Sequence, residues 1–174
     1  MTLEQLTAIP REEGSTKALI RGVAARLQEL GHKIGGFSAY VTSGVPAGSG
    51  LSSSAALEIL LGSIFSFLYN DGSLDPVMLA QVGQYAENRY FGKPCGLMDQ
   101  LAASVGGAVA VDFLDLQNPK VESIPCDFDR MGYALYVVNA GGSHAGLTSE
   151  YAAIPPEMGS VAAYFGKKGA AGGG

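Results

Sequence analysis

The sequence predicts a mixed α+β fold, in which strands flank a cluster of helices. Three observations support this prediction. Apolar residues recur at helical spacing in several segments, residues 36–42 alternate between apolar and polar side chains, and residues 133–139 are apolar nearly throughout. The chain has 174 residues, of which 47% are hydrophobic, and this is enough to form a buried core in one folded unit.

The first half of the chain is expected to contain two helices, with a strand and a loop between them. In residues 17–30 the apolar side chains recur at helical spacing, and Gly31 is typical of a helix end. Residues 36–42 are predicted to form a strand, and a loop rich in Gly, Pro and Ser follows at residues 43–53. Residues 54–69 are apolar on most faces, which predicts a helix that is buried nearly all round.

The second half is expected to contain both helices and strands. Asp75 and Pro76 are typical of a helix start, because proline suits the first turn, and this helix is expected to reach Tyr90. Gly106 and Gly107 predict a turn before the next strand. The other predicted elements are a loop at 92–96, a helix at 98–104, strands at 108–113, 121–124 and 133–139, and a helix at 156–165.

Composition makes several classes of function unfavourable without ruling them out. The chain has 11 Lys and Arg against 16 Asp and Glu, which gives a formal net charge of −5, and its pI is near 4.9. It therefore lacks the basic surface that binding to nucleic acid or to an anionic membrane requires. It has no apolar run typical of a membrane span and no opening typical of a signal peptide. Because two cysteines form no disulfide framework, we expect a cytoplasmic protein.

Two compositional figures are unusual. Charged residues make up 16% of the chain, where about 25% is usual, and 25 residues are glycine. So few charges cannot cover the surface of an ordinary folded domain. We therefore expect apolar faces that are covered by further polypeptide or that drive self-association. Residues 169–174 contain only Gly and Ala and are expected to form an unstructured tail.

The strongest functional signal is the loop between the first predicted strand and the second predicted helix. Glycines allow backbone N–H groups to close around a phosphate, and the first turn of the next helix adds free N–H groups and a positive dipole end. Serine hydroxyls can bond to phosphate or ligate Mg²⁺. The alternative is a flexible loop in which Ser52 caps the helix. The candidate phosphate-binding residues are Pro46, Ala47, Gly48, Ser49, Gly50, Leu51, Ser52, Ser53 and Ser54.

Two carboxylates are further candidates. Asp99 follows a glycine-containing turn. In the functional interpretation it is a general base or an anion that orients a sugar hydroxyl. In the structural interpretation it complements the helix dipole. Glu87 lies on a helix face otherwise filled by Tyr and Ala. It is a possible Mg²⁺ ligand, although an exposed helical glutamate is the more common case.

Taken together, these blocks resemble the GHMP kinase family. The serine-rich loop is similar to the ATP-binding signature of the family, and residues 87–100 resemble its galactokinase branch. Residues 141–151 are similar to a third galactokinase segment, and the three blocks keep the family's order and spacing over about residues 15–168. The resemblance implies the α+β fold of the family, a sheet of the ribosomal protein S5 domain 2 type with a helix cluster on one face.

The resemblance also implies a reaction, in which ATP phosphorylates a hexose such as galactose at the C1 hydroxyl with the help of Mg²⁺. The serine-rich loop would cradle the ATP phosphates. Ser54, or its neighbour Ser53, would reach the metal together with Glu87. Asp99 would face the sugar hydroxyl as a base or orienting anion. The residues implied at the sugar pocket are Cys95, Gly96 and Asp99.

The chain also departs from the family pattern. Galactokinases are roughly twice as long, a length typical of two domains. The amino-terminal sugar-binding signature has no counterpart in residues 1–16, and the carboxy-terminal glycine-rich phosphate motif is not found. We therefore expect residues 1–168 to be the central part of a galactokinase-like chain, which spans the N-terminal domain and the start of the second domain. Alone, this part is expected to have an incomplete fold and no activity. The alternative is a non-catalytic nucleotide- or sugar-sensing module on the same scaffold.

Overall fold

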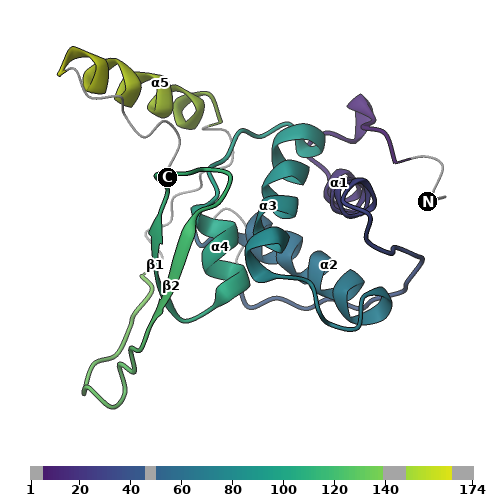
Figure 1. Cartoon of the computed structure of the whole chain (residues 1–174), viewed down its shortest axis with the longest axis horizontal. Helices are drawn as coiled ribbons and strands as arrows, with labels where there is room; N and C mark the ends of the chain where they lie inside the picture. The colour runs from purple at the N-terminus through teal and green to yellow at the C-terminus, as the bar shows by residue number, and fades with distance from the viewer. Residues whose placement is uncertain (1–5, 46–49, 139–147, 166–174) are drawn as a thin grey trace.

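The computed structural model describes residues 6–45, 50–138 and 148–165. Four helices pack together in its first part, namely α1 (Thr16–Glu29), α2 (Ser53–Tyr69), α3 (Pro76–Ala86) and α4 (Met98–Val105). A short 3-10 helix, η1 (Pro10–Glu12), precedes them, and a π-helical turn, η2 (Glu87–Phe91), continues α3. The strands β1 (Ala108–Asp112) and β2 (Lys120–Ile124) and the helix α5 (Thr148–Tyr164) follow (Figure 1).

The local sequence explains where two of the helices begin. The side chain of Ser15 accepts a hydrogen bond from the backbone N–H of Ala18 and so caps α1. Asp75 caps α3 in the same way through the N–H of Met78, and Pro76 occupies the first turn. Both predicted helices are confirmed, except that the last predicted turn of the second one is π-helical.

The core lies where α1, α2, α3 and α4 meet. Gly22 of α1 lies so close to α3 that a Cβ atom added to it would be 2.8 Å from the Cα atom of Ala86. The two helices can approach this closely only because residue 22 has no side chain. Burial of apolar side chains between the helices is the main favourable contribution to the stability of this region. The most completely buried ones include Val23, Leu27, Ala80, Val82 and Leu101.

The predicted strands at 108–113 and 121–124 are confirmed, and they form a hairpin. β1 and β2 pair antiparallel, with Asp112 opposite Lys120. Gly106 and Gly107 both have a positive φ and turn the chain from α4 into β1, as the sequence predicts. The hairpin lies beside the helices (Figure 1). Three of its partly buried side chains pack against the helical core, namely Val111, Phe113 and Val121.

Two predicted strands are not formed in the described part of the chain. Residues 36–42 and 133–138 take no part in a sheet, so these two predictions are wrong; residue 139 lies outside the described residues. A strand is stable only when a neighbouring strand receives its backbone hydrogen bonds, and neither segment has such a neighbour among the described residues. The large apolar side chains of the second segment are left 65% to 86% exposed, namely Tyr133, Leu135, Tyr136, Val137 and Val138.

Two helices also differ from the prediction. α2 buries only one face, because Phe67 and Leu68 are exposed, so the prediction of a helix buried nearly all round is wrong. α5 begins at Thr148 rather than at residue 156, and two prolines lie inside it. The described fold is therefore a mixed one, in which the sheet has two strands instead of the larger sheet that we expected. None of the described helices is both long and apolar enough to span a membrane.

Candidate active site

The loop that precedes α2 is described from Gly50 onward, and Pro46–Ser49 lie outside the described residues. Gly50 has a φ of +76° and Ser52 a φ of +55°, so the backbone is left-handed at both residues just before the helix. α2 begins at Ser53, and the first turn of an α-helix has backbone N–H groups without intrahelical partners. Such a helix end is suited to binding an anion.

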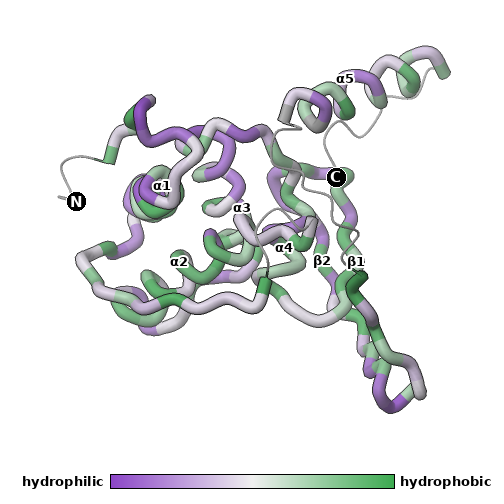
Figure 2. The backbone as a smooth tube through the Cα atoms, turned by 180° about the vertical axis from the view of Figure 1, so that it is seen from behind, coloured by the Kyte–Doolittle hydropathy of each residue, from purple (hydrophilic) through white to green (hydrophobic). Residues whose placement is uncertain are grey.

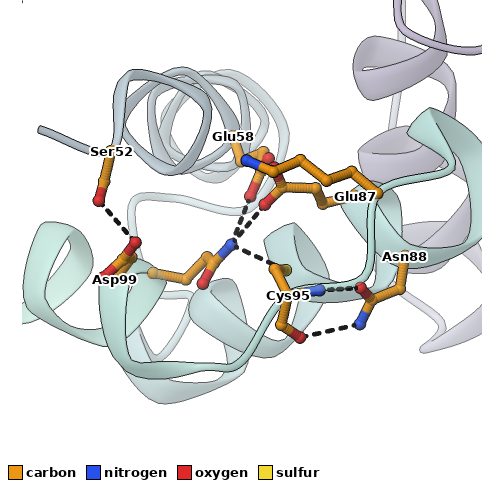
Figure 3. A network of polar contacts seen from close by, with 8 residues as sticks. Ser52, Glu58, Glu87, Asn88, Cys95 and Asp99 are labelled. Atoms are coloured by element: carbon orange, nitrogen blue, oxygen red, sulfur yellow. Dashed lines mark hydrogen bonds and ion pairs between the residues drawn. The ribbon is translucent and has the colours of Figure 1, made fainter. Parts of the chain in front are cut away.

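Ser52 joins this loop to the second motif. Its hydroxyl donates a hydrogen bond of 2.6 Å to Oδ2 of Asp99, which lies in the first turn of α4. Figure 3 shows the two side chains pointing toward each other. Ser52 precedes α2 as its N-cap residue, but its side chain makes no capping hydrogen bond, so the predicted serine cap is wrong. The structure therefore brings Asp99 to the end of the serine-rich loop.

Glu87 is the first residue of η2, and its side chain is buried, with a residue exposure of only 2%. The alternative of an exposed helical glutamate is therefore wrong. Nε2 of Gln100 donates a hydrogen bond of 3.0 Å to Oε2 of Glu87, and Nζ of Lys93 lies 3.6 Å from Oε1. A π-helical turn changes the direction of the side chains that it carries and is frequent at functional sites.

Glu58 of α2 is a member of the site that the sequence analysis missed. Its residue exposure is 1%, and its Oε2 atom accepts a hydrogen bond of 3.1 Å from Nε2 of Gln100. Burial, together with the nearby charge of Glu87, raises the pKa of Glu58 to about 8. The one available signal was a single carboxylate within the otherwise apolar segment of residues 54–69.

Side chains hold the loop between η2 and α4 in place. Oδ1 of Asn88 accepts a hydrogen bond of 2.7 Å from the backbone N–H of Cys95, and the side-chain amide of Asn88 donates to the backbone oxygen of Cys95 (Figure 3). The side-chain amide of Gln84 donates to the same oxygen. Burial, and then the charge of Glu87, raises the pKa of the Cys95 thiol. Cys95 and Gly96 therefore form a fixed, partly buried segment directly before α4, which carries Asp99.

Glu87, Ser53 and Ser54 offer the oxygen ligands that a hard cation such as Mg²⁺ prefers, although Nζ of Lys93 already lies 3.6 Å from Oε1 of Glu87. Oε1 of Glu87 is buried and has no hydrogen-bond partner, and Ser53 and Ser54 offer hydroxyls at the start of α2. Ser54 and Glu87 make no hydrogen bond to each other, so the structure does not itself join the two predicted ligands. In the described ranges no three His, Cys, Asp or Glu side chains are grouped to hold a metal. Mg²⁺ bound with phosphates commonly uses only one or two carboxylates.

Comparisons with known proteins show the family to which the chain is similar. The family model for the GHMP kinases N terminal domain matches residues 18–107, which contain all the described site residues. A galactokinase of Pyrococcus furiosus is 38% identical over 151 residues, which are 87% of this chain and 41% of that protein. Galactokinases of Streptomyces coelicolor and Clostridium tetani are 39% and 34% identical over 82% and 75% of this chain.

The chain spans only 33% to 41% of the length of these three relatives. The family model, in contrast, matches more than half of the chain, from residue 18 to residue 107. The chain therefore belongs to the GHMP kinase family.

Proposed function

We propose that the full-length natural protein with this sequence transfers the γ-phosphoryl group of ATP to the C1 hydroxyl of a hexose, with galactose as the first candidate. The relatives described above are named galactokinases, and residues 87–100 resemble that branch of the family. The hydrogen bond between Ser52 and Asp99 is the observation that carries the proposal. It holds an acidic side chain at the end of a loop that is suited to phosphate.

In this proposal, Pro46–Ser54 binds the ATP phosphates through backbone N–H groups, and the positive end of α2 adds to the attraction. Ser54 and Glu87 hold Mg²⁺, with Ser53 as the neighbouring hydroxyl. The metal, when bound, neutralises part of the charge on the phosphates during transfer. Phosphoryl transfer depends mainly on such neutralisation and on the position of the acceptor.

Asp99 receives the proton of the acceptor hydroxyl or orients that hydroxyl toward the γ-phosphate. Its carboxylate already accepts one hydrogen bond from Ser52, which fixes its direction and leaves further lone pairs for a sugar hydroxyl. The backbone of Cys95 and Gly96 lines the sugar pocket, and Asn88 keeps this segment in position.

The proposal extends to the fold and the location of the protein. We infer that β1 and β2 belong to a larger sheet of the ribosomal protein S5 domain 2 type, with residues 1–168 as a central part of the complete chain. The free thiols of Cys95 and Cys126 support a reducing, cytoplasmic environment. The net charge of −5 supports small-molecule substrates rather than nucleic acid or a membrane.

An assay of ADP release with and without galactose and other hexoses tests the proposal, with the product identified by ³¹P NMR. We expect the full-length natural protein to turn over sugar at about 1–100 s⁻¹ and to form a sugar 1-phosphate. The 174-residue chain alone is expected to show no sugar-dependent turnover. Sugar binding without turnover by the full-length protein would favour the sensing module. Turnover by the 174-residue chain would contradict the incomplete fold.

A second measurement tests the phosphate loop. Gly50→Val places a branched side chain at a residue with a φ of +76°, where the phosphates are proposed to lie. We expect calorimetry to show that ATP binding is lost while the circular dichroism of the folded protein is kept. Unchanged ATP binding would mean that the loop does not contact the nucleotide.

We also propose that the exposed apolar segment of residues 133–138 drives weak self-association of the 174-residue chain. Sedimentation velocity at increasing protein concentration should show a rising average mass. The double variant Leu135→Ser and Val137→Ser should reduce this effect, whereas an unchanged concentration dependence would contradict the assignment.

A further inference from the structure

A buried polar cluster connects three elements of the candidate site. It consists of the side chains of Glu58 from α2, Glu87 from η2 and Gln100 from α4. All three are almost completely buried. Figure 3 shows the side chains of Glu58 and Glu87 directed at one nitrogen atom, and the hydrogen bonds identify it as Nε2 of Gln100. Polar groups this deeply buried need an explanation, because burying them without full pairing costs stability.

The side-chain amide of Gln100 links the two carboxylates. Nε2 carries two hydrogens, and it donates across 3.1 Å to Oε2 of Glu58 and across 3.0 Å to Oε2 of Glu87. Because this neutral group donates two hydrogen bonds in different directions, it pairs one oxygen of each buried glutamate. An apolar side chain of similar length would fill the space but would leave both carboxylates without a donor.

Gly83 of α3 makes room for this link. A Cβ atom added to Gly83 would lie 3.0 Å from Oε2 of Glu58 and 3.4 Å from Cγ of Gln100. The first distance is too short for an ordinary contact, so a side chain at residue 83 would displace Glu58. The absence of a side chain at Gly83 thus allows α3 to pack against Glu58 and Gln100 while these two side chains stay hydrogen-bonded.

The cluster is not arranged for stability. Oε1 of Glu58, Oε1 of Glu87 and Oε1 of Gln100 are all buried without a hydrogen-bond partner. Lys93 offsets part of the charge, with its Nζ atom 3.6 Å from Oε1 of Glu87. Apolar residues of the same size would fill such a site at lower cost, since a buried polar atom without a hydrogen-bond partner costs stability and apolar packing does not. The arrangement therefore points to a role in function.

The position of the cluster indicates which function this is. Glu58 lies one helical turn after Ser54, on the same face of α2, and Ser54 is in the first turn of this helix, at the proposed phosphate site. Glu87 is the proposed carboxylate of the metal site. Gln100 directly follows Asp99 in the first turn of α4. One amide group thus joins the proposed metal carboxylate to Glu58 of α2, and it belongs to the residue next to Asp99 in α4.

We propose, on the basis of the function proposed above, that Gln100 and Glu58 are positioning residues for the metal carboxylate and for Asp99. Glu58 holds the amide of Gln100, and the amide fixes the direction of Glu87 and the orientation of the first turn of α4. Neither side chain touches a substrate. Residues that orient a metal ligand in this way typically change metal affinity or activity by about 10- to 100-fold when they are replaced.

The test compares variants of the full-length natural protein. Gln100→Met keeps the length of the side chain and removes both donors, whereas Glu58→Gln keeps an oxygen that accepts the hydrogen bond from Gln100. Gln81→Met is the matched control, because Gln81 lies on α3 and donates to the backbone oxygen of Gln117, away from the cluster. The measurements are thermal unfolding, calorimetric ATP binding at increasing Mg²⁺ concentration, and kcat and KM for the sugar.

For Gln100→Met we expect a lower unfolding temperature, because Glu58 and Glu87 stay buried and lose their hydrogen-bond donor. The Mg²⁺ concentration that gives half of the maximal increase in ATP affinity should rise about tenfold or more, and kcat should fall by a similar factor. ATP binding without Mg²⁺ and the KM for the sugar should change less than about threefold. Glu58→Gln should keep most of the Mg²⁺ response of the original protein, and Gln81→Met should leave all values unchanged.

A folded Gln100→Met protein with an unchanged Mg²⁺ response and unchanged kcat would overturn the proposal. If this variant does not fold, Glu58→Leu is measured in its place. It removes the group that holds the amide of Gln100 and still allows the hydrogen bond between Gln100 and Glu87. An unchanged Mg²⁺ response of this variant would again overturn the proposal. If the original protein binds ATP with Mg²⁺ but phosphorylates no sugar, the proposed reaction fails, and the calorimetric comparison still tests the positioning role. Absence of ATP binding in the original protein would overturn both.

Discussion

The helices α1 to α4 bury their apolar side chains against one another, whereas the described residues after β2 leave most of their apolar side chains exposed. The buried apolar cluster and the residues packed against it extend from Leu6 to Val121, and no described residue after Val121 belongs to it. Figure 2 shows hydrophobic residues along both regions, and both views show α5 apart from α1 to α4. Hydrophobic composition alone therefore does not decide which part of the chain forms a core.

The difference teaches that helices and strands depend on their neighbours in different ways. A helix pairs its backbone groups internally and needs a neighbour only for one apolar face. A strand needs a neighbour for its backbone as well. The predicted helices α1 to α4 consequently formed, whereas the apolar segment of residues 133–138 remains unpaired and exposed.

The largest expected effect comes from removing a leucine side chain in each region. Leu27 in α1 is 0% exposed, whereas Leu135 is 78% exposed. Leu27→Ala should lower the free energy of unfolding by about 2–5 kcal/mol, because it leaves a cavity in the core. Leu135→Ala should change it by less than about 0.5 kcal/mol. Urea unfolding followed by circular dichroism measures both, and equal losses would contradict the division into two regions.

A smaller effect is expected from adding a methyl group to a helical glycine in each region. Gly22→Ala should destabilise the protein by about 1–3 kcal/mol, because the new Cβ atom meets Ala86 at 2.8 Å. A Cβ atom added to Gly159 of α5 would meet no neighbouring part of the described chain within 4 Å, so Gly159→Ala should raise helix content slightly or leave stability unchanged. Thermal unfolding followed by circular dichroism measures both effects. A stabilising Gly22→Ala variant would show that α1 and α3 do not approach as described.

The smallest effect concerns one ion pair in each region. Arg21 binds Glu12 through two hydrogen bonds of 2.9 and 3.1 Å, and these bonds lower the pKa of Glu12 below its usual value of 4.5. Since the folded protein holds this carboxylate ionised, the pair stabilises the fold at neutral pH, and the contribution is lost as the pH falls below 4.5. Glu12→Gln should lower the unfolding temperature at pH 7 and make less difference in acid.

The control for this prediction is Asp127→Asn, which removes the exposed ion pair between Asp127 and Arg130. Exposed pairs contribute little to stability, so the unfolding temperature of this variant should match that of the original protein at both pH values. A Glu12→Gln variant whose unfolding temperature is lowered equally at pH 7 and in acid would show that charge is not the cause.

Much of the helical region could be predicted from the sequence. Helical spacing of apolar residues, the helix start at Asp75 and Pro76, and the turn at Gly106 and Gly107 are local signals, and each of them corresponds to a feature of the structure. The strands at 36–42 and 133–139 could not be decided in this way. The alternating pattern of the first segment and the continuous apolar run of the second show which side chains could be buried in a sheet. Neither pattern shows whether another strand lies beside the segment, because that depends on distant parts of the chain.

The site could be predicted only in part, for a related reason. Asp99, Glu87 and the serine-rich loop stand in motifs, so sequence reasoning selected them. The burial of Glu87 and the links through Glu58 and Gln100 arise where three elements meet, and no local pattern reports this. The direction of the Ser52 side chain, which bonds to Asp99 instead of capping α2, likewise depends on the packing of α4 beside α2.

The central claim is that Asp99 acts on a sugar hydroxyl at the end of a phosphate-binding loop, and Asp99→Asn in the full-length natural protein tests it most directly. The variant keeps the shape of the side chain and an oxygen that accepts the hydrogen bond from Ser52. We predict that kcat for the sugar falls by about 100-fold or more while the calorimetric affinity for ATP stays the same. A kcat close to that of the original protein would contradict the account.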